Sequence, residues 1–381
     1  MGKEVLIVGR VLHVITSLHH GGAQRHLHIL MAGQRAAGWS VDLAYLKDPY
    51  LVNQFQSVAE RVIDLHAQAT VSPWVIPRLI RLIRAGHYDV IHTHLLKADA
   101  YGAVAARLAG GAVLISSKHN DEAVLRRPLV GTIHGRLARL TDRVIVLSDH
   151  VGRYMRDRGH VPSGRLRRVY YGITPDTGAA TAAARAAVRA EFGVPAEASL
   201  LLTIGRLDPQ KGHLDLLAAL RQAAAALPTV QLIVAGAPQQ ASADYEQALR
   251  AAAAAPELAA RVHWAGHRDD VPALLAACDI VVQPSHWEGF GLVLVEAMAA
   301  QRPVVATAVS AIPEVVRDGE TGLLVPPHDP HALARALLQL CGDPERRARL
   351  GAAGAARVQA HFTAERMVRE TLAVYAEARA S

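Results

Sequence analysis

Short runs of β-branched and apolar residues alternate along this chain with longer Ala-, Leu- and Arg-rich segments of helical period. We predict two series of five strands: Val11–Ser17, Val41–Tyr45, Val90–His92, Val113–Ser116 and Val144–Leu147, then Leu200–Ile204, Gln231–Ala235, Val262–Ala265, Ile280–Gln283 and Val304–Thr307. Strands that alternate with helices form βαβ units in parallel sheets. The two series indicate an α/β protein with two doubly wound domains, and they fit one closed eight-stranded barrel less well.

The two strand series meet near Tyr170–Pro175. We predict domains over residues 1–173 and 174–360, with a linker in the Ala- and Thr-rich stretch 178–190. Ligands of open parallel sheets bind beyond the carboxyl ends of the strands. We therefore expect the functional site in a cleft between the two domains.

The composition narrows the class of protein. The chain has 381 residues, 51% hydrophobic and 20% charged, which excludes a disordered or fibrous chain. Its two cysteines are too few for a disulfide framework or a four-cysteine zinc site. No apolar run reaches the ~18–20 residues of a membrane span, and the opening segment Met1–Arg10 is too short for a signal peptide. These features predict a cytoplasmic protein.

Basic residues are concentrated in the first part of the chain. The net charge is +7, and residues 1–173 hold 23 basic and 12 acidic residues. Such a surplus favours an anionic neighbour, either a membrane surface or a phosphorylated acceptor, although a solvated arginine-rich surface is the simpler interpretation. Nucleic acid is disfavoured, because no recognised binding motif accompanies the charge. Residues 72–87 have the pattern of a basic interfacial helix or, more commonly, of a helix packed on its own sheet.

A loop with two cations follows the first strand of the second series. Arg206 and Lys211 lie five residues apart in Gly205–Gly212, which Pro209 stiffens. Arginine presents a planar fork to phosphate oxygens, and lysine presents a compact charge. The pair fits a diphosphate, and the alternative is an ordinary surface loop.

A glycine-rich loop with two carboxylates follows the strand at 280–283. Gly291 precedes a predicted helix that begins near Leu292, so the amides of Phe290, Gly291 and Leu292 point toward a bound anion or a sugar oxygen. Glu288 and Glu296 are eight residues apart, and a carboxylate can accept bonds from vicinal hydroxyls. The alternatives are a first-turn acid that matches the helix dipole and a solvent-facing helix residue.

Strands of the first series are followed by segments that give weaker indications of a ligand-binding site. The glycine pair at 21–22 allows a close approach of the backbone to a ligand, and Gly22 leads into a helix. His119 follows a strand end, where an imidazole can donate to a hydroxyl or a phosphate oxygen. His92 and His94 lack a third ligand at a recognisable spacing. The chain also has no Asp-x-Asp clamp for a metal–nucleotide complex, so we expect no metal and no other cofactor.

Taken together, these segments resemble the large retaining glycosyltransferase family 4, also called glycosyl transferases group 1, which has the GT-B fold. The resemblance rests on four segments in particular: Gly205–Gly212, the Glu-x7-Glu of 288–296, Asp89–His94 and Ser117–Asn120. It covers nearly the whole chain from Val11. It implies two Rossmann-like domains that face each other across a cleft, with a last helix at about 361–381 that crosses back to the first domain.

The resemblance also implies roles for single residues. Arg206 and Lys211 would contact the diphosphate of a nucleotide-sugar donor, most often linked to UDP or GDP. Glu296 would hold the ribose, and Glu288 the hydroxyls of the transferred sugar. The amides of Phe290, Gly291 and Leu292 would line the sugar and phosphates. Gly22 would approach the diphosphate, and His119 would touch the sugar near the reacting centre.

The family implies a hexosyltransferase that works without a metal and retains the anomeric configuration by front-side attack on the donor. The acceptor is a hydroxyl compound that the sequence does not identify, whether lipid-linked, a saccharide or a small natural product. Tyr171 and Thr174 stand where the family commonly has Asn and Asp, which affects acceptor choice and closure more than donor binding. A sugar-nucleotide epimerase of related fold and a non-catalytic nucleotide-sugar-binding protein are the alternatives.

Overall fold

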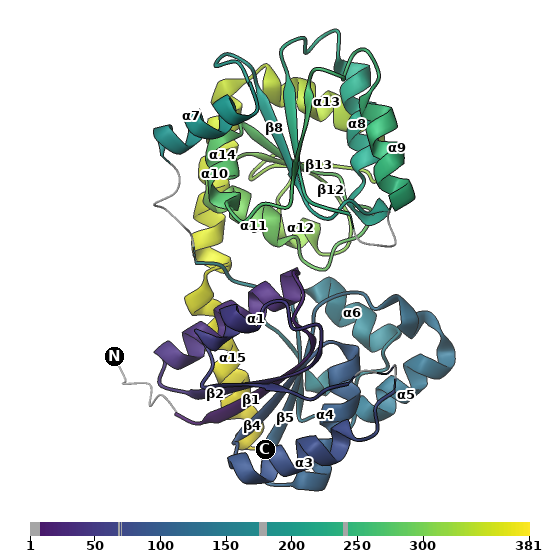
Figure 1. Ribbon diagram of the computed structural model, residues 1–381, viewed down its shortest axis with the longest axis vertical. Helices are drawn as coiled ribbons and strands as arrows, with labels where there is room; N and C mark the ends of the chain where they lie inside the picture. The colour runs from purple at the N-terminus through teal and green to yellow at the C-terminus, as the bar shows by residue number, and fades with distance from the viewer. Residues whose placement is uncertain (1–7, 68, 70, 175–180, 239–242) are drawn as a thin grey trace. The chain divides into compact units, whose positions relative to one another are not determined.

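The computed structural model describes residues 8–381, except 68, 70, 175–180 and 239–242 (Figure 1). The chain divides into two compact units, one of residues 1–174 with 362–381 and one of residues 175–361. Each unit has its own parallel sheet with helices on both faces (Figure 1). The predicted α/β fold with two Rossmann-like sheets is therefore confirmed. Most of the opening segment Met1–Arg10, which the sequence indicates is too short for a signal peptide, lies outside the described residues.

The first unit contains a seven-stranded parallel sheet in the order β3-β2-β1-β4-β5-β6-β7. The strands are β1 Arg10–Ser17, β2 Ser40–Lys47, β3 Arg61–Asp64, β4 Val90–His94, β5 Val113–Lys118, β6 Arg143–Val146 and β7 Leu166–Arg168. The helices are α1 Gly22–Ala36, α2 Val52–Gln56, α3 Val75–Gly86, α4 Leu96–Ala109, α5 Pro128–Ala138, α6 Asp149–Asp157 and α15 Ala364–Arg379. Short 3-10 turns occur at Ala123–Arg126 and Ser163–Arg165.

Side-chain alternation along β1 divides the core of the first unit into two layers. Val11 and Ile15 pack in one cluster with residues of α1 and α15, whereas Leu12 and Val14 pack in another with residues of α3 and α4. This is the period-2 pattern of a strand that is covered on both faces. The C-terminal helix α15 thus belongs to the first unit, although its residues are last in the chain.

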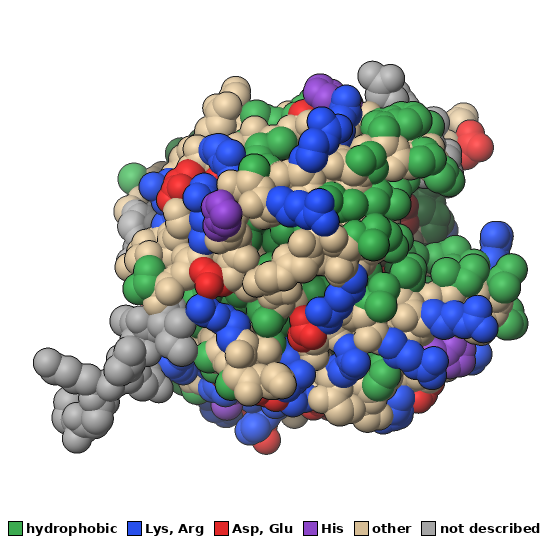
Figure 2. All heavy atoms as spheres, turned by 90° about the horizontal axis from the view of Figure 1, so that it is seen from below, with side chains coloured by type: hydrophobic (Ala, Val, Ile, Leu, Met, Phe, Trp, Pro, Cys, Tyr) green, Lys and Arg blue, Asp and Glu red, His purple; other side chains and the backbone are tan. Residues whose placement is uncertain are grey.

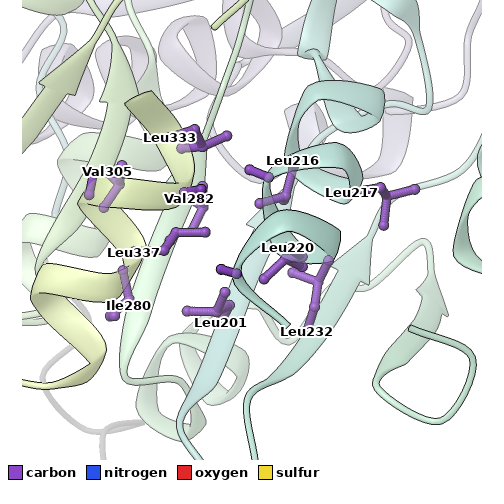
Figure 3. Packing of buried hydrophobic residues seen from close by; sticks show 14 of the residues in the cluster. Leu201, Leu216, Leu217, Leu220, Leu232, Ile280, Val282, Val305, Leu333 and Leu337 are labelled. Atoms are coloured by element: carbon purple, nitrogen blue, oxygen red, sulfur yellow. The ribbon is translucent and has the colours of Figure 1, made fainter. Parts of the chain in front are cut away.

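The second unit contains a six-stranded parallel sheet in the order β10-β9-β8-β11-β12-β13. The strands are β8 Leu200–Ile204, β9 Gln231–Ala235, β10 Val262–Gly266, β11 Ile280–Gln283, β12 Val304–Thr307 and β13 Leu323–Val325. The helices are α7 Ala182–Glu191, α8 His213–Ala223, α9 Ala243–Ala253, α10 Val271–Ala277, α11 Leu292–Ala299, α12 Ile312–Val315, α13 Pro330–Cys341 and α14 Pro344–His361, with a 3-10 turn at Pro209–Lys211. In Figure 3, Leu201 and Val282 of the sheet lie against leucines of α8 and α13, which keep the central strands in place.

The described part of the chain has three strands that the sequence pattern did not predict: β3, β7 and β13. Each has only three or four residues, and each lies at an edge of its sheet. β3 and β7 carry charges, as in the sequence Leu-Arg-Arg of β7, so they lack a hydrophobic run that would reveal them. β13 is the apolar sequence Leu-Leu-Val, and with three residues it is too short to show a strand pattern.

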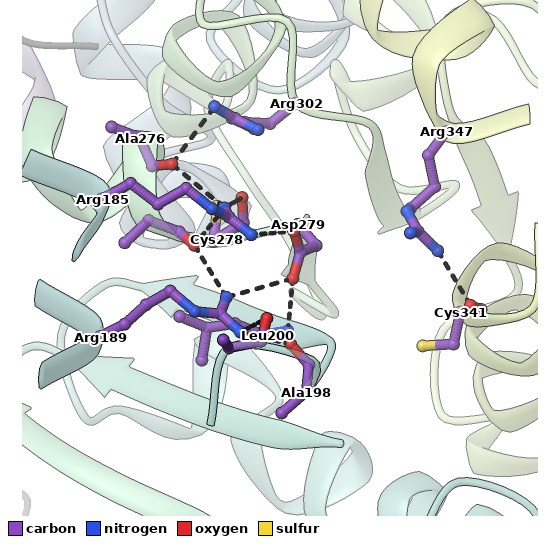
Figure 4. Close-up of polar contacts among 12 residues, drawn as sticks. Arg185, Arg189, Ala198, Leu200, Ala276, Cys278, Asp279, Arg302, Cys341 and Arg347 are labelled. Carbon is purple, nitrogen blue, oxygen red and sulfur yellow. Dashed lines mark hydrogen bonds and ion pairs between the residues drawn. The ribbon is translucent and has the colours of Figure 1, made fainter. Parts of the chain in front are cut away.

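The predicted linker at 178–190 is partly wrong. Residues 178–180 lie outside the described part, but Ala182–Glu191 forms α7, which Thr181 caps through its side chain. Figure 4 shows how α7 is anchored: Arg185 Nη2 lies 2.8 Å from Asp279 Oδ1, and Arg189 donates to backbone carbonyls that include that of Ala198. Alanine is the strongest helix former, so an Ala-rich stretch that looked like a linker folds as a helix.

The basic amphipathic segment at 72–87 forms α3, which packs on its own sheet. Val75, Leu79 and Ile83 are buried in the cluster with Leu12 and Val14. The guanidinium of Arg78 donates to the carbonyl of Leu65 at 2.9 Å. Of the two interpretations of this segment, the packed helix is the one that the structure shows. Among the described residues, no helix is both long enough and apolar enough to span a membrane.

Many arginines of the first unit are engaged within it. Arg143 and Arg167 both pair with Glu377 of α15, and Arg10 and Arg61 both pair with the buried Asp42. In the space-filling view of Figure 2, Lys and Arg side chains are spread over the visible face with hydrophobic side chains between them. Part of the basic surplus therefore serves the fold of this unit.

Candidate functional site

The candidate site lies where the strand order of the second sheet reverses. β8 is paired with β9 on one side and with β11 on the other, so the chain turns in opposite directions after β8 and after β11. Ligands of open parallel sheets bind beyond the carboxyl ends of the strands at such a point. The loops that follow β8 and β11, with the start of α11, carry all of the predicted donor-binding residues except Gly22, which lies in the first unit.

Gly212 allows these two loops to meet. Its φ is +66°, and a Cβ atom at this position would lie 2.0 Å from the carbonyl oxygen of Pro284. Two hydrogen bonds hold the loops together: the amide of His286 donates to the carbonyl of Gln210 at 2.8 Å, and the Gln210 side chain donates to the carbonyl of Trp287 at 3.0 Å. Only glycine combines this backbone conformation with so close an approach.

The contact brings Lys211 and Glu288 together as an ion pair. Lys211 Nζ lies 2.7 Å from Glu288 Oε2, and both side chains are 14% exposed. The same carboxylate oxygen accepts a hydrogen bond from Ser285 Oγ at 3.2 Å, and the Glu288 amide donates to Ser310 Oγ at 3.3 Å. The site thus places the Lys211 ammonium group beside the Glu288 carboxylate, and both groups are partly accessible to solvent.

Arg206 lies on the same loop and is more exposed than Lys211. Its Nη2 atom donates to Gln210 Oε1 at 3.2 Å, so it reaches over the residue that joins the two loops. A long exposed side chain of this kind can turn toward a ligand at little cost, because an exposed polar contact contributes little to stability.

The start of α11 adds backbone donors to the site. Gly291 caps the helix with φ +84° and has no side chain that could accept from the first amides. The first amides of a helix have no intrahelical partner, and they carry the positive end of the helix dipole. By contrast, the side chains of Ser148, Thr181, Asp329 and Thr363 cap α6, α7, α13 and α15. Helices α1 and α4 also lack a side-chain cap, and in α11 the Leu294 amide donates to the carbonyl of Gly291 at 2.9 Å. The amides before Leu294 suit an anion or another ligand.

The remaining predicted residues of this loop differ in exposure. Phe290 is buried and Leu292 is half-buried, so the loop enters α11 over an apolar base. Glu296 lies in the second turn of α11 and is only 8% exposed. Its burial excludes the solvent-facing alternative.

Gly22 and His119 lie in the first unit. Gly22 is the first residue of α1, whose cap is Gly21, and the Gln24 side chain donates to the carbonyl of Ser17 at 3.0 Å to close the turn. His119 follows β5 and is 8% exposed. These two residues belong to a different unit from Lys211 and Glu288, and their predicted contacts with a donor stay predictions.

Both ring nitrogens of His119 are hydrogen-bonded inside the first unit. Nε2 lies 3.1 Å from His94 Nδ1, and Nδ1 bonds to the hydroxyl of Tyr171. The pKa of His119 is lowered to about 4, chiefly by burial, with Asp99 opposing the shift and Lys118 adding to it. The imidazole is thus neutral at pH 7, and it would have to exchange one of these bonds to contact a sugar.

His119 is the end of a buried chain of hydrogen bonds. The Gln34 amide donates to Tyr375, so its carbonyl oxygen accepts from His13 Nε2 at 2.8 Å. His13 Nδ1 must then accept from His94 Nε2 at 2.9 Å. Burial lowers the pKa of these rings, so each is neutral at pH 7 and has one donor and one acceptor nitrogen. The same logic then makes His94 accept from His119 and His119 accept from Tyr171, which gives each ring one tautomer. The sequence singled out Tyr171 only as a departure from the family pattern, and it did not reveal this chain, because the residues come from distant segments.

Two groups of described residues have ligand atoms close enough for a metal ion. His13, His92 and His94 form one in the first unit, and Asp215, His286 and His328 form the other in the second unit. The third histidine that the pair His92 and His94 lacked in the sequence comes from β1, the neighbouring strand. That first group is fully buried, with His13 and His94 bonded as described above and His92 bonded to Tyr375 and Ser117, so it needs no ion to satisfy it.

Comparison with known proteins identifies both halves of the chain. Residues 184–357 match the family described as glycosyl transferases group 1, and residues 20–177 match glycosyltransferase family 4. The D-inositol 3-phosphate glycosyltransferase of Nocardioides is 32% identical over 77% of this chain and 68% of its own length. That of Mycolicibacterium gilvum is 34% identical over 66% of this chain and 58% of its own length. The chain thus spans about three fifths to two thirds of the length of these relatives.

Solved structures show the same fold over almost the whole chain. Anabaena HepE, solved with UDP and glucose, superposes with a TM-score of 0.86 at 23% identity and covers 97% of this chain and 100% of HepE. The sucrose-phosphate synthase of Thermosynechococcus elongatus superposes with a TM-score of 0.79 at 26% identity, covering 97% of this chain and 98% of that enzyme. With matching sequence families in both halves and this shared architecture, the chain belongs to the glycosyl transferases group 1, the family 4 glycosyltransferases of GT-B fold.

Proposed function

We propose that this protein transfers a hexosyl group from a nucleoside-diphosphate sugar to a hydroxyl acceptor. The observation that carries the proposal is the Lys211–Glu288 pair beside the glycine-capped start of α11. A diphosphate needs positive side chains and backbone amides, and a sugar needs a carboxylate acceptor for its hydroxyls. The two loops at the reversal point of the second sheet supply all of these groups.

In this proposal the ligand replaces the pairing between Lys211 and Glu288. Lys211 and Arg206 take the diphosphate oxygens, with amides of Phe290, Gly291 and Leu292 on the same anion. Glu288, released from the lysine, accepts from hydroxyls of the sugar. Glu296 accepts from the ribose, which explains why a carboxylate sits so deep in α11.

Cleavage of the bond to the donor builds negative charge on the leaving diphosphate and positive charge on the sugar ring. Lys211, Arg206 and the helix amides stabilise the first charge, and each such contact contributes about 2–4 kcal/mol to the transition state. We propose front-side attack with retention, in which the leaving phosphate accepts the proton of the acceptor hydroxyl. Glu288 then orients the sugar, because a glycosidase mechanism needs two acids that flank the anomeric carbon.

We propose UDP or GDP as the donor nucleotide and a phosphorylated hydroxyl compound as the acceptor. The names of the inositol-phosphate glycosyltransferase relatives and the UDP held by HepE support these choices. The basic surplus of residues 1–173 agrees with an anionic acceptor. We propose no metal requirement, because the diphosphate is matched by side-chain and backbone donors.

The test begins with a thermal-shift screen of UDP-, GDP- and dTDP-sugars, followed by transfer to inositol phosphate with the donor that binds. NMR of the product should show the anomeric configuration of the donor, and transfer should survive added chelator. Inversion would exclude front-side attack. Turnover of the donor without any acceptor would favour an epimerase, and binding without turnover would favour a sugar-nucleotide sensor.

Replacement of the lysine is the sharpest single variant. We expect Lys211→Ala to lower the transfer rate at least about tenfold, because one charge contact to the leaving group is lost. The matched control is Lys47→Ala, since Lys47 is an exposed lysine of the first unit. Circular dichroism should show both variants folded. A near-wild-type rate for Lys211→Ala would remove this lysine from the donor site.

A further inference from the structure

Three side chains of the second unit converge beside the candidate donor site without serving it. Asp215 lies in the first turn of α8, His286 follows β11 in the loop of Glu288, and His328 lies in the loop between β13 and α13. Asp215 and His286 are 71 residues apart in the chain, so no sequence spacing reveals the group. None of the three has a role in the proposed transfer.

The three ligand atoms are close together. His286 Nε2 lies 2.9 Å from Asp215 Oδ2, His328 Nδ1 lies 3.9 Å from the same oxygen, and all three atoms lie within 4.8 Å of one another. The two imidazole rings are adjacent, with centroids 3.8 Å apart. A tetrahedral zinc ion with bonds of about 2.0–2.1 Å separates its ligands by about 3.3 Å, so small side-chain rotations would complete the site.

The chemical types of the three ligand atoms indicate which class of metal ion the group would bind. Two imidazoles and one carboxylate suit zinc, cobalt or nickel, whereas magnesium and calcium prefer oxygen ligands alone. Three protein ligands leave a fourth position to water, and His328 is 67% exposed, so an ion can enter from solvent. We propose that Asp215, His286 and His328 form a binding site for a divalent transition-metal ion, with zinc as the natural occupant.

The backbone holds these residues in place. The Asp215 amide donates to the carbonyl of Gly212 at 3.0 Å, and the His286 amide donates to the carbonyl of Gln210 at 2.8 Å. His328 has a φ of +56°, an uncommon conformation for a residue other than glycine. An ion bound here would join the loop after β8, the loop after β11 and the loop after β13, two of which carry Lys211 and Glu288.

The alternative is that Asp215 and His286 form an ion pair and nothing more. His328 separates the two cases, because its removal leaves the 2.9 Å contact between Asp215 and His286 intact. His331 provides a matched control, since it is an exposed histidine three residues further along the same chain segment and is not part of the group.

The experiment uses the full chain, prepared without a polyhistidine tag and stripped of metal, and titrates it with Co²⁺ and with Zn²⁺. Calorimetry should show one ion per chain, and bound Co²⁺ should show visible d–d absorption. We expect His328→Ala and Asp215→Asn to weaken binding at least about tenfold, which is the lower range for loss of a group that supports a metal site. His331→Ala should bind as the wild type does.

A second readout is independent of sugar transfer. Zn²⁺ should raise the melting temperature of the wild type in proportion to the logarithm of its concentration, and it should not raise that of His328→Ala. The proposal is overturned when the wild type binds neither ion, when binding survives in His328→Ala, or when His331→Ala loses it. Failure of transfer with every sugar donor would test the proposed function and leave this result unaffected.

Discussion

At the scale of single residues, the first unit is notable for neutral histidines in its core. His13, His92 and His94 are fully buried between the sheet and its covering helices, and hydrogen bonds satisfy each ring. Desolvation by burial lowers the pKa of His13 to about 4 and that of His92 and His94 well below the ordinary value. The chain Tyr171–His119–His94–His13–Gln34 therefore depends on every ring staying uncharged.

Stability should consequently fall on acidification. An unfolded histidine takes up a proton below about pH 6.5, whereas the folded rings resist it down to about pH 4, so the stability that they contribute is complete above pH 6.5 and is lost as pH falls toward 4. Each pH unit in that window costs about 1.4 kcal/mol per histidine. Calorimetric melting of the first unit between pH 7.5 and pH 5 measures the effect. His331→Asn should show the same slope as the wild type, and a flat profile over this range would contradict the explanation.

At the scale of elements, the close approach of the backbones of two loops, those after β8 and β11, determines the geometry of the candidate site. Each loop follows a buried strand and leads into a helix capped by glycine, Gly212 for α8 and Gly291 for α11. The Gln210 side chain then joins one loop to the other through the carbonyl of Trp287, and Ser285 holds Glu288 within the loop after β11. The position of Lys211 relative to Glu288 is thus set by strand pairing and by a missing Cβ atom.

Gly212→Ala tests that dependence. An added Cβ atom would meet the carbonyl of Pro284 at 2.0 Å, so the two loops must separate and the Lys211–Glu288 contact must lengthen. We expect donor affinity to fall at least about tenfold, in addition to the ~1–2 kcal/mol that a left-handed conformation costs an L-residue. Gly319→Ala is the matched control, because Gly319 has φ +73° with nothing within 4 Å of its Cβ position.

Isothermal titration with the donor found in the screen, together with melting curves, separates the two effects. Gly319→Ala should lose stability and keep donor affinity. Equal donor affinity in Gly212→Ala and wild type would show that loop separation has no bearing on the site.

At the scale of the whole molecule, the chain builds two units with separate cores. The first closes with α15, whose Met367 and Tyr375 pack in the core that contains Val11 and Ile15. The second runs from 175 to 361 and contains Arg206, Lys211, Glu288 and Glu296. Because these groups all belong to one unit, donor binding should act first on that unit.

Hydrogen exchange of the full chain with and without nucleotide sugar checks this expectation. We expect new protection in residues 205–212 and 284–296, because ligand contacts suppress local opening there. The melting temperature should rise with the logarithm of donor concentration. Lys211→Ala should show little of either effect, and protection confined to residues 8–174 would contradict the placement of the donor.

The sequence by itself determined the two doubly wound sheets and most of their strands. It also determined the two loops in which charged residues stand close to glycines, the loop after β8 and the loop after β11. Buried parallel strands are continuous hydrophobic runs, and glycine next to Arg, Lys or Glu at a strand end is a local signal. Only the tertiary structure decided that Lys211 pairs with Glu288, that His13, His94 and His119 form one chain, and that Asp215, His286 and His328 meet. The tertiary structure also decided the edge strands β3, β7 and β13, because these short segments become strands by pairing with a neighbouring strand. Contacts between segments tens of residues apart depend on strand order and register, and neither can be deduced from the amino-acid sequence of a single chain.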